Sequence, residues 1–190
     1  MIGRRAGLLL LVHLLAGAAT ASDLDARTGY RVQNYRAPVT LPVEGGTRVD
    51  LAEVDRLTRA GAVLVDVMPQ RGGYDPATGA WRLVDRRDTI PGAVWLPEVG
   101  RGSLDTRLAR YFALSLTRLT GGDRARPVVF FCMADCWMSW NAVRRAAGLG
   151  YTRLSWFADG TDGWREDDRP FVPAVPPPVP LLEDSEATPP

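Results

Sequence analysis

Both cysteines of the chain lie in one short run, FFCMADCW, at residues 130–137. An apolar segment that reads as a strand gives way there to a segment that reads as a helix. Backbone N–H groups at a helix start stabilise anions, including a thiolate, so Cys132 is predicted to be a nucleophile with a lowered pKa. Cys136 lies four residues on and could trap it as a disulfide. The alternative is an inert structural disulfide that only holds the loop.

The composition leaves these thiols as the only strong nucleophiles. The single histidine, His13, lies in a predicted signal segment, and all 23 basic residues are arginine. The mature chain therefore lacks Cys–His and Ser–His couples, histidine metal sites and lysine Schiff-base chemistry. Two cysteines are too few for an ordinary structural zinc site, so no metal is expected. With a formal charge of +1 the chain has no overall basic footprint for nucleic acid.

The chain divides into four parts. Residues 1–21 read as a cleaved secretory signal, with a charged start, an apolar stretch and small residues at its end. That stretch is shorter than the roughly 20 residues that span a bilayer, so no membrane span is expected after cleavage. Residues 22–46 are predicted to form an extended arm, and residues 47–169 the domain. The proline-rich residues 170–190 are expected to be disordered or an extended strap, with binding to a partner a further alternative.

Apolar patterning predicts alternating helices and strands within the domain. Asp50 is predicted to cap the first helix, and Gly61 to end it. Further helices are expected at 104–119 and 137–148, strands at 62–67, 127–131 and 154–157 with a short one after the turn at 90–93, a surface excursion at 72–87, and a closing loop at 159–164. This alternation predicts an α/β fold with a central parallel sheet flanked by helices on both faces.

Several of these stretches together resemble a rhodanese-like domain, over roughly residues 47–165. The resemblance rests on the first core strand ending in Asp66, an Ile-Pro-Gly-Ala turn, the strand that delivers Cys132, a Gly-Tyr pair and a final Gly-x-x-x-Trp, which here are residues 63–67, 90–93, 128–132, 150–151 and 160–164. It implies the rhodanese-like fold and a Cys132 that accepts sulfane sulfur as a persulfide. The loop residues Met133, Ala134, Asp135 and Trp137 would surround that sulfur.

A narrower resemblance is to a periplasmic rhodanese-like group associated with pyrroloquinoline-quinone (PQQ)-dependent alcohol catabolism and named for a CXXCW motif. It rests on the Cys-x-x-x-Cys-Trp run, the loop 156–164, the segment 66–69 and a Tyr-Arg-Ala-Pro at 35–38. The name implies two residues between the cysteines, whereas this chain has three. The resemblance implies a periplasmic location and partners in a quinoprotein oxidation pathway. No residue pattern indicates a PQQ site, and no cofactor is predicted.

The loop departs from the ordinary rhodanese pattern in its charge. Asp135 stands where glycine is common, Trp137 where arginine is often found, and no basic residue lies between Cys132 and Ser139. A dianion such as thiosulfate would be held poorly unless Arg71, Arg144 or Arg145 reaches the loop; a solvated helix face is the alternative for the last two.

The remaining candidate site residues each allow a structural and a functional interpretation. Asp66 is expected to organise a loop rather than act as a base. The tryptophans could wall a binding surface or fill the core: Trp137, Trp140, Trp156 and Trp164. Asp159 and Asp162 could form a turn, orient the last loop or bind a cation.

The sequence therefore predicts an exported rhodanese-like protein whose Cys132 and Cys136 perform sulfur transfer or thiol–disulfide chemistry, associated with quinoprotein alcohol oxidation. The alternative is a non-enzymatic interaction or assembly module for a periplasmic quinoprotein dehydrogenase system, with the cysteines as a structural disulfide. Pull-down with and without the tail would discriminate the two, and finding no specific exported partner under either condition would count against the second.

Overall fold

The computed structural model describes residues 23–181. Its elements in chain order are β1 (Thr47–Val49), α1 (Leu51–Arg59), β2 (Val63–Asp66), β3 (Asp88–Thr89), β4 (Val94–Trp95), α2 (Thr106–Thr120), β5 (Val128–Phe131), α3 (Trp137–Gly148), β6 (Leu154–Phe157), α4 (Gly160–Glu166) and β7 (Val172–Pro173). The predicted signal, residues 1–21, and the last part of the tail, residues 182–190, lie outside the described residues. No helix within the described part is long and apolar enough to cross a bilayer.

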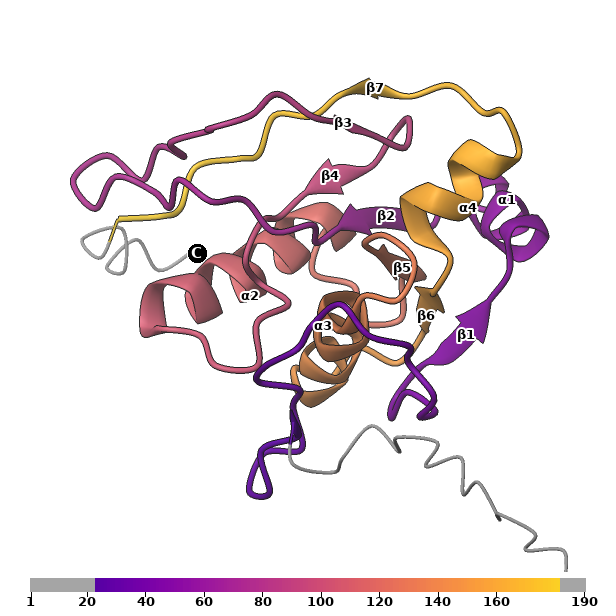
Figure 1. The fold of residues 1–190 in the computed structure, drawn as a ribbon, viewed down its shortest axis with the longest axis horizontal. Coiled ribbons are helices and arrows are strands. Elements are labelled where there is room, and N and C mark those ends of the chain that lie inside the picture. The colour runs from indigo at the N-terminus through magenta and orange to yellow at the C-terminus, as the bar shows by residue number, and fades with distance from the viewer. Residues whose placement is uncertain (1–22, 182–190) are drawn as a thin grey trace, which may run out of the picture.

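Five parallel strands form the central sheet, in the order β1-β6-β5-β2-β4 (Figure 1). Every residue of β2 and β5 is buried, as expected of strands covered on both faces. In the register, Asp66 stands opposite Phe131, and Phe131 opposite Phe157. The carboxyl ends of three strands therefore meet along one edge, and the residues that follow them are brought together there.

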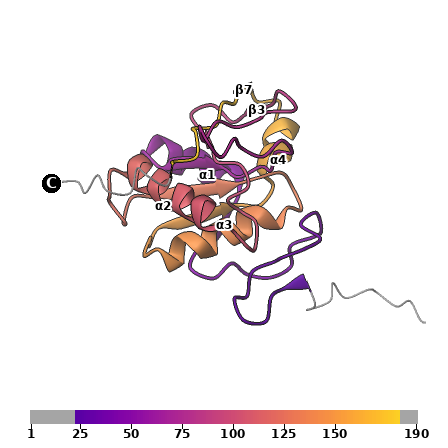
Figure 2. The same cartoon turned by 90° about the vertical axis from the view of Figure 1, so that its left-hand side faces the viewer.

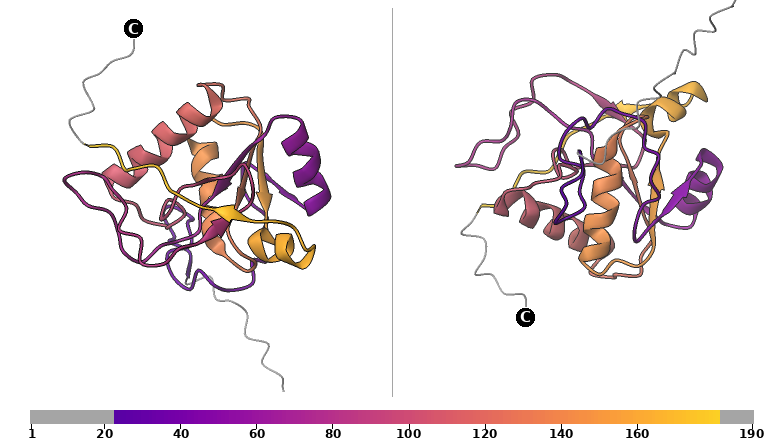
Figure 3. Two further views of the ribbon diagram at one scale, coloured as in Figure 1. Left: turned by 90° about the horizontal axis from the view of Figure 1, so that it is seen from above. Right: turned by 60° about the horizontal axis from the view of Figure 1, so that its bottom comes forward.

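Helices cover both faces of the sheet, as predicted. Figure 3 shows α1 and α4 on one face and α2 and α3 on the other. The strand pleat explains the two cores, because successive side chains point to opposite faces. Leu64 joins the cluster that contains Leu57 of α1, whereas Val65 joins the cluster that contains Phe112 of α2 and Val143 of α3.

Two aspartates fix the starts of the first two helices. The Asp50 carboxylate accepts the Glu53 N–H at 2.9 Å, which confirms the predicted cap of α1. The Asp105 carboxylate accepts the Leu108 N–H at 2.8 Å, so α2 begins at Thr106 rather than at residue 104. The third long helix, α3, has Cys136 at its N-cap position, with an extended backbone there.

The prediction of a loop at 159–164 is wrong, because α4 occupies most of it. Two glycines and two aspartates gave that segment the composition of a turn. Gly160 is needed for another reason: its φ is +53°, and a β-carbon there would lie 2.4 Å from the Cys132 carbonyl oxygen. The short strands β1, β3 and β7 were also not predicted, since two or three residues are too few to show a period.

Residues 170–181 form an extended strap over the 72–87 excursion. The Pro177 carbonyl accepts the Trp81 indole N–H at 2.9 Å and the Tyr111 hydroxyl at 3.0 Å. Val179 is buried, and its N–H donates to the Gly79 carbonyl at 2.9 Å. The strap pairs with the excursion through antiparallel β3 and β7, which lie side by side in Figures 1 and 2. Residues 170–181 therefore form the extended strap that was one of the two predictions for this segment.

Candidate active site

The two cysteines lie at the carboxyl edge of the sheet, on one closed loop. Cys132 directly follows β5, and Cys136 directly precedes α3. Both side chains are buried, with exposed fractions of 0% and 4%. The thiols are not joined as a disulfide; the Cys132 thiol donates to the Met68 Sδ at 3.2 Å, and each thiol shifts the pKa of the other. The two thiols therefore lie together where β5 ends and α3 begins.

The surroundings shift the two thiol pKa values in opposite directions, and the pKa of Cys132 is raised rather than lowered as the helix start predicted. Burial raises the pKa of Cys132, and the nearby Cys136 and Asp66 raise it further. The neighbouring Cys132 thiol lowers the pKa of Cys136, with help from the Met138 and Met133 N–H groups and from the charge of Arg36. The N–H groups at the start of α3 and the charge of Arg36 thus favour the anion of Cys136, whereas burial disfavours the anion of Cys132.

Asp66 organises the loop that follows β2. One carboxylate oxygen accepts the Met68 N–H at 2.9 Å, and the other accepts the Thr89 hydroxyl at 2.6 Å and pairs with Arg87 at 2.8 Å. Burial raises the pKa of Asp66, and the charge of Arg87 opposes that rise. This loop sets the Met68 side chain against the site, with its Sδ 3.2 Å from the Cys132 Sγ.

The closing segment of the domain supports the cysteine loop from one side. The Thr161 N–H donates to the Cys132 carbonyl at 2.9 Å, and the Asp162 carboxylate accepts the Ala134 N–H at 3.1 Å. Asp159 pairs instead with Arg48 at 3.3 Å. Asp162 therefore orients the loop, and it uses one of the N–H groups that could otherwise have faced an anion. No three His, Cys, Asp or Glu side chains gather as a metal-binding group in residues 23–181.

The N-terminal arm crosses the cysteine loop from the other side. The Ala37 N–H donates to the Asp135 carbonyl at 3.0 Å, and the Trp137 N–H donates to the Tyr35 carbonyl at 2.9 Å. Between these bonds Arg36 stands opposite Cys136 in a β-bridge. Asp135 has a φ of +51°, so the backbone turns sharply where the arm meets it. The arm thus closes the loop with main-chain hydrogen bonds.

Arg36 is the site residue that sequence reasoning missed. Nothing in the pattern of its Tyr-Arg-Ala-Pro segment shows that this segment reaches a loop 100 residues away. The expected arginines have other partners: Arg71 pairs with Asp85, Arg144 with Glu44, and Arg145 donates to the Val99 carbonyl. Neither Arg144 nor Arg145 lies on a purely solvated face, since both side chains are largely buried against the fold.

The tryptophans fill the core rather than wall an open surface. Trp137, Trp140 and Trp156 are each 2% exposed. The Trp137 and Trp140 rings pack edge to face at 5.2 Å, and the Arg31 guanidinium lies 4.7 Å from the Trp137 ring centroid. Trp164 is half-buried against the α1 cluster. Trp137 therefore supports the cysteine loop from beneath.

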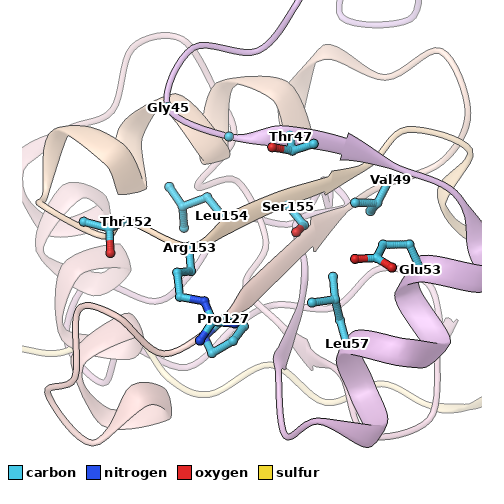
Figure 4. A pocket seen from close by; sticks show the side chains of 11 residues that line it. Gly45, Thr47, Val49, Glu53, Leu57, Pro127, Thr152, Arg153, Leu154 and Ser155 are labelled. Atoms are coloured by element: carbon cyan, nitrogen blue, oxygen red, sulfur yellow. The ribbon is translucent and has the colours of Figure 1, made fainter.

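None of the three cavities described below is lined by either thiol. One of about 580 Å³ lies at the opposite end of the sheet, between β1, α1 and the start of β6; Figure 4 shows Thr47, Glu53 and Ser155 on its wall. Two smaller cavities flank the cysteine loop: one of about 120 Å³ touches Ala134 and Asp135, and one of about 200 Å³ touches Met68.

A family model described as a rhodanese-like domain matches residues 50–167, more than half of the chain. The chain belongs to the rhodanese-like domain family. The match runs from the cap of α1 to the end of α4 and contains the whole cysteine loop. The family assignment agrees with the predicted fold; the narrower CXXCW group is not part of it. A comparison with curated proteins finds no match.

Solved structures share the fold at low identity. EanB with hercynine bound is 20% identical with a TM-score of 0.46, and the alignment covers 68% of this chain and 32% of that one. A polysulfide-sulfur transferase homodimer from Wolinella succinogenes is 16% identical with a TM-score of 0.42, covering 67% and 79%. A full-length Lactobacillus plantarum protein is 18% identical with a TM-score of 0.44, covering 66% and 87%. The chain thus spans about a third of the EanB length.

Proposed function

We propose that this rhodanese-like protein performs sulfur transfer coupled to thiol–disulfide exchange through Cys132 and Cys136. The observation that carries the proposal is geometric: Cys132 directly follows β5, Cys136 lies at the N-cap position of α3 close enough to interact with it, and Arg36 stands opposite Cys136. One thiol favours the anion and so can attack sulfur, while its neighbour holds a proton that a leaving group can take. Such a division of roles is what a nucleophile and its resolving thiol require.

The proposed reaction has two steps. The Cys136 thiolate attacks the outer sulfur of an anionic donor R–S–S⁻, so that a Cys136 persulfide forms and the thiolate R–S⁻ leaves. The Cys132 sulfur then attacks the Cys136 Sγ, a disulfide forms, and hydrosulfide leaves with the Cys132 proton. The two electrons that reduce the transferred sulfur come from the two thiols. A dithiol reductant must restore them before the next cycle.

The setting of this chemistry is proposed from the sequence. A cleaved signal at residues 1–21 would place the mature protein in the periplasm, an oxidising compartment in which the disulfide form persists until a partner reduces it. The likeness to the PQQ-associated group suggests exported proteins of a quinoprotein alcohol-oxidation pathway as donors or acceptors. No cofactor is needed for either step of the proposed reaction.

The test compares the wild type with Cys132→Ser and Cys136→Ser. Cyanolysable sulfur and thiol–disulfide turnover are measured for each protein with a polysulfide donor and a dithiol reductant. Both variants should lose turnover by at least tenfold, because each lacks one half of the disulfide. Equal turnover in all three proteins would contradict a catalytic role for the pair.

A second candidate is a non-enzymatic interaction or assembly module for a quinoprotein system. The observation that favours it is the closure of the site: both thiols are buried, and the arm is bridged across them. Capture of exported proteins with the full chain, and with Cys132 and Cys136 both replaced by serine, separates the two functions. Specific capture that survives the double replacement, together with no sulfur turnover, would favour this candidate.

A further inference from the structure

We propose that the cavity of about 200 Å³ beside Met68 is the entry and anion-binding site through which a small sulfur-bearing anion reaches Cys132 and Cys136. This inference rests on the proposed function, because only that function gives a sulfur-bearing anion a reason to bind in the cavity. The cavity itself is a feature of the fold. Its wall is formed by the loop after β2, the end of the 72–87 excursion and β4, namely Met68, Pro69, Gln70, Arg71, Val84, Asp85, Arg87 and Trp95.

Met68 separates this cavity from the buried thiols. Its side chain lines the cavity, and its sulfur lies 3.2 Å from the Cys132 Sγ. Methionine is unbranched and has several rotatable bonds, so its side chain moves more readily than other core side chains. A change of the Met68 rotamer would join the cavity to Cys132 without any movement of the backbone. The other face of the cysteine loop is covered by the arm.

Arg87 gives the cavity an unused donor. Its Nη2 pairs with Asp66 at 2.8 Å, and its guanidinium lies 4.7 Å from the Trp95 ring centroid. The Nη1 atom is buried and has no hydrogen-bond partner among the described residues. Leaving a buried donor unpaired costs about 1–3 kcal/mol, more when the group is charged. A small rotation of the Arg87 guanidinium toward the cavity would let an anionic ligand accept from this donor.

The mouth of the cavity is open and carries a second cation. Val84 is 61% exposed, and the Arg71 side chain is 78% exposed while it pairs with Asp85 at 2.6 Å. The lining therefore holds two arginines, of which Arg87 pairs with the buried Asp66 and Arg71 with the exposed Asp85. Exposed pairs are weak, about 0–1 kcal/mol, so an incoming anion can compete with Asp85 for Arg71. The volume suits a small anion such as thiosulfate or a short polysulfide rather than a large organic donor.

The experiment measures initial rates of alkylation of Cys132 and of Cys136 by iodoacetate and by iodoacetamide, with site-resolved mass spectrometry. Both reagents react with the same thiolate, so the ratio of their rates cancels any change in thiol pKa and reports only the preference for an anion. Arg87→Gln and Arg71→Gln should lower the ratio by about threefold, a change equivalent to a weak ion pair. Arg86→Gln, at an exposed arginine outside the cavity lining, should leave it unchanged.

Met68 is tested by a second pair of variants. Met68→Ala should speed alkylation of Cys132 by both reagents about tenfold, because thiol reactivity follows access. Met68→Leu, which keeps most of the volume, should not. The proposal is overturned if Met68→Ala and Met68→Leu react alike, or if Arg71→Gln and Arg87→Gln both keep the wild-type ratio. Should Arg87→Gln unfold because Asp66 loses its partner, the exposed Arg71→Gln decides the outcome.

Alkylation needs no sulfur transfer, which keeps the two proposals separable. If the arginine and Met68 variants behave as expected while cysteine replacement leaves sulfur turnover unchanged, the entry site stands and the proposed function fails. If instead the cysteine replacements abolish sulfur turnover while the arginine and Met68 variants behave like the wild type, sulfur transfer stands and the anion must reach the thiols by another route.

Discussion

Cys132 and Cys136 are only four residues apart, but different parts of the fold act on each. Cys132 is fully buried and lies near the Asp66 carboxylate, which comes from β2. Cys136 lies at the start of the 12-residue helix α3 and near Arg36, which comes from the arm. The sequence predicted the helix start, and hence a stabilised thiolate, from local pattern. The local pattern could not show that Asp66 and Arg36 also act on the two thiols, because these charges come from distant segments.

Replacing Arg36 by glutamine should raise the pKa of Cys136. Thiolate reactivity rises with pH through the thiol pKa, so the curve of Cys136 alkylation rate against pH should move to higher pH. The shift should shrink at high salt, because the Arg36 side chain is exposed and its charge is screened. The matched control is Arg27→Gln, at another exposed arginine of the arm. Superimposable curves for Arg36→Gln and the wild type would show that the arm supplies no charge to the site.

The helices and strands explain how one loop comes to hold the site. Apolar runs in the sequence predict β2, β5 and β6, and a capping aspartate predicts the start of α1. The helix α4 was missed because Gly160 and Gly163 have the composition of a turn. Its role is visible only in space, where Gly160 lies against the Cys132 carbonyl and Asp162 holds the Ala134 N–H. Thus α4 fixes the cysteine loop.

Gly160→Ala should therefore destabilise the domain and disturb the thiols. A β-carbon there meets both an unfavourable positive φ and the backbone of Cys132. The free energy of unfolding should fall by about 2 kcal/mol or more. Gly122→Ala is the matched control, since Gly122 also has a positive φ but open space around it, so a loss of only about 1 kcal/mol is expected. Denaturant unfolding measures both, and equal losses would show that Gly160 makes no special contact.

Across the whole molecule, two extended segments complete what the α/β core leaves open. The arm crosses the cysteine loop, and the strap at 170–181 crosses the excursion at 72–87. The sequence predicted the arm as extended, and the proline-rich tail as either disordered or an extended strap. Where they pack could not be predicted, since single contacts such as Trp81 with Pro177 leave no periodic trace. The family match at residues 50–167 likewise stops short of both segments.

If the strap is part of the folded domain, its buried side chains should contribute to stability. Val179 is 1% exposed and belongs to the main core cluster, whereas Val175 is 80% exposed. Val179→Ala should lower the free energy of unfolding by about 2 kcal/mol, because it leaves a small cavity. Val175→Ala should change it by less than about 0.5 kcal/mol. Chemical denaturation of both variants measures the difference, and identical midpoints would mean that the strap does not pack as described.

In the proposed reaction, Cys136 attacks the donor sulfur and Cys132 resolves the resulting persulfide. One equivalent of a polysulfide donor is added to the reduced wild type, Cys132→Ser and Cys136→Ser, and the added sulfur is located by site-resolved mass spectrometry. The wild type should form the Cys132–Cys136 disulfide and release sulfide, Cys132→Ser should hold a persulfide on Cys136, and Cys136→Ser should take up little sulfur. A persulfide on Cys132 of Cys136→Ser, formed as fast as the wild type reacts, would contradict the account.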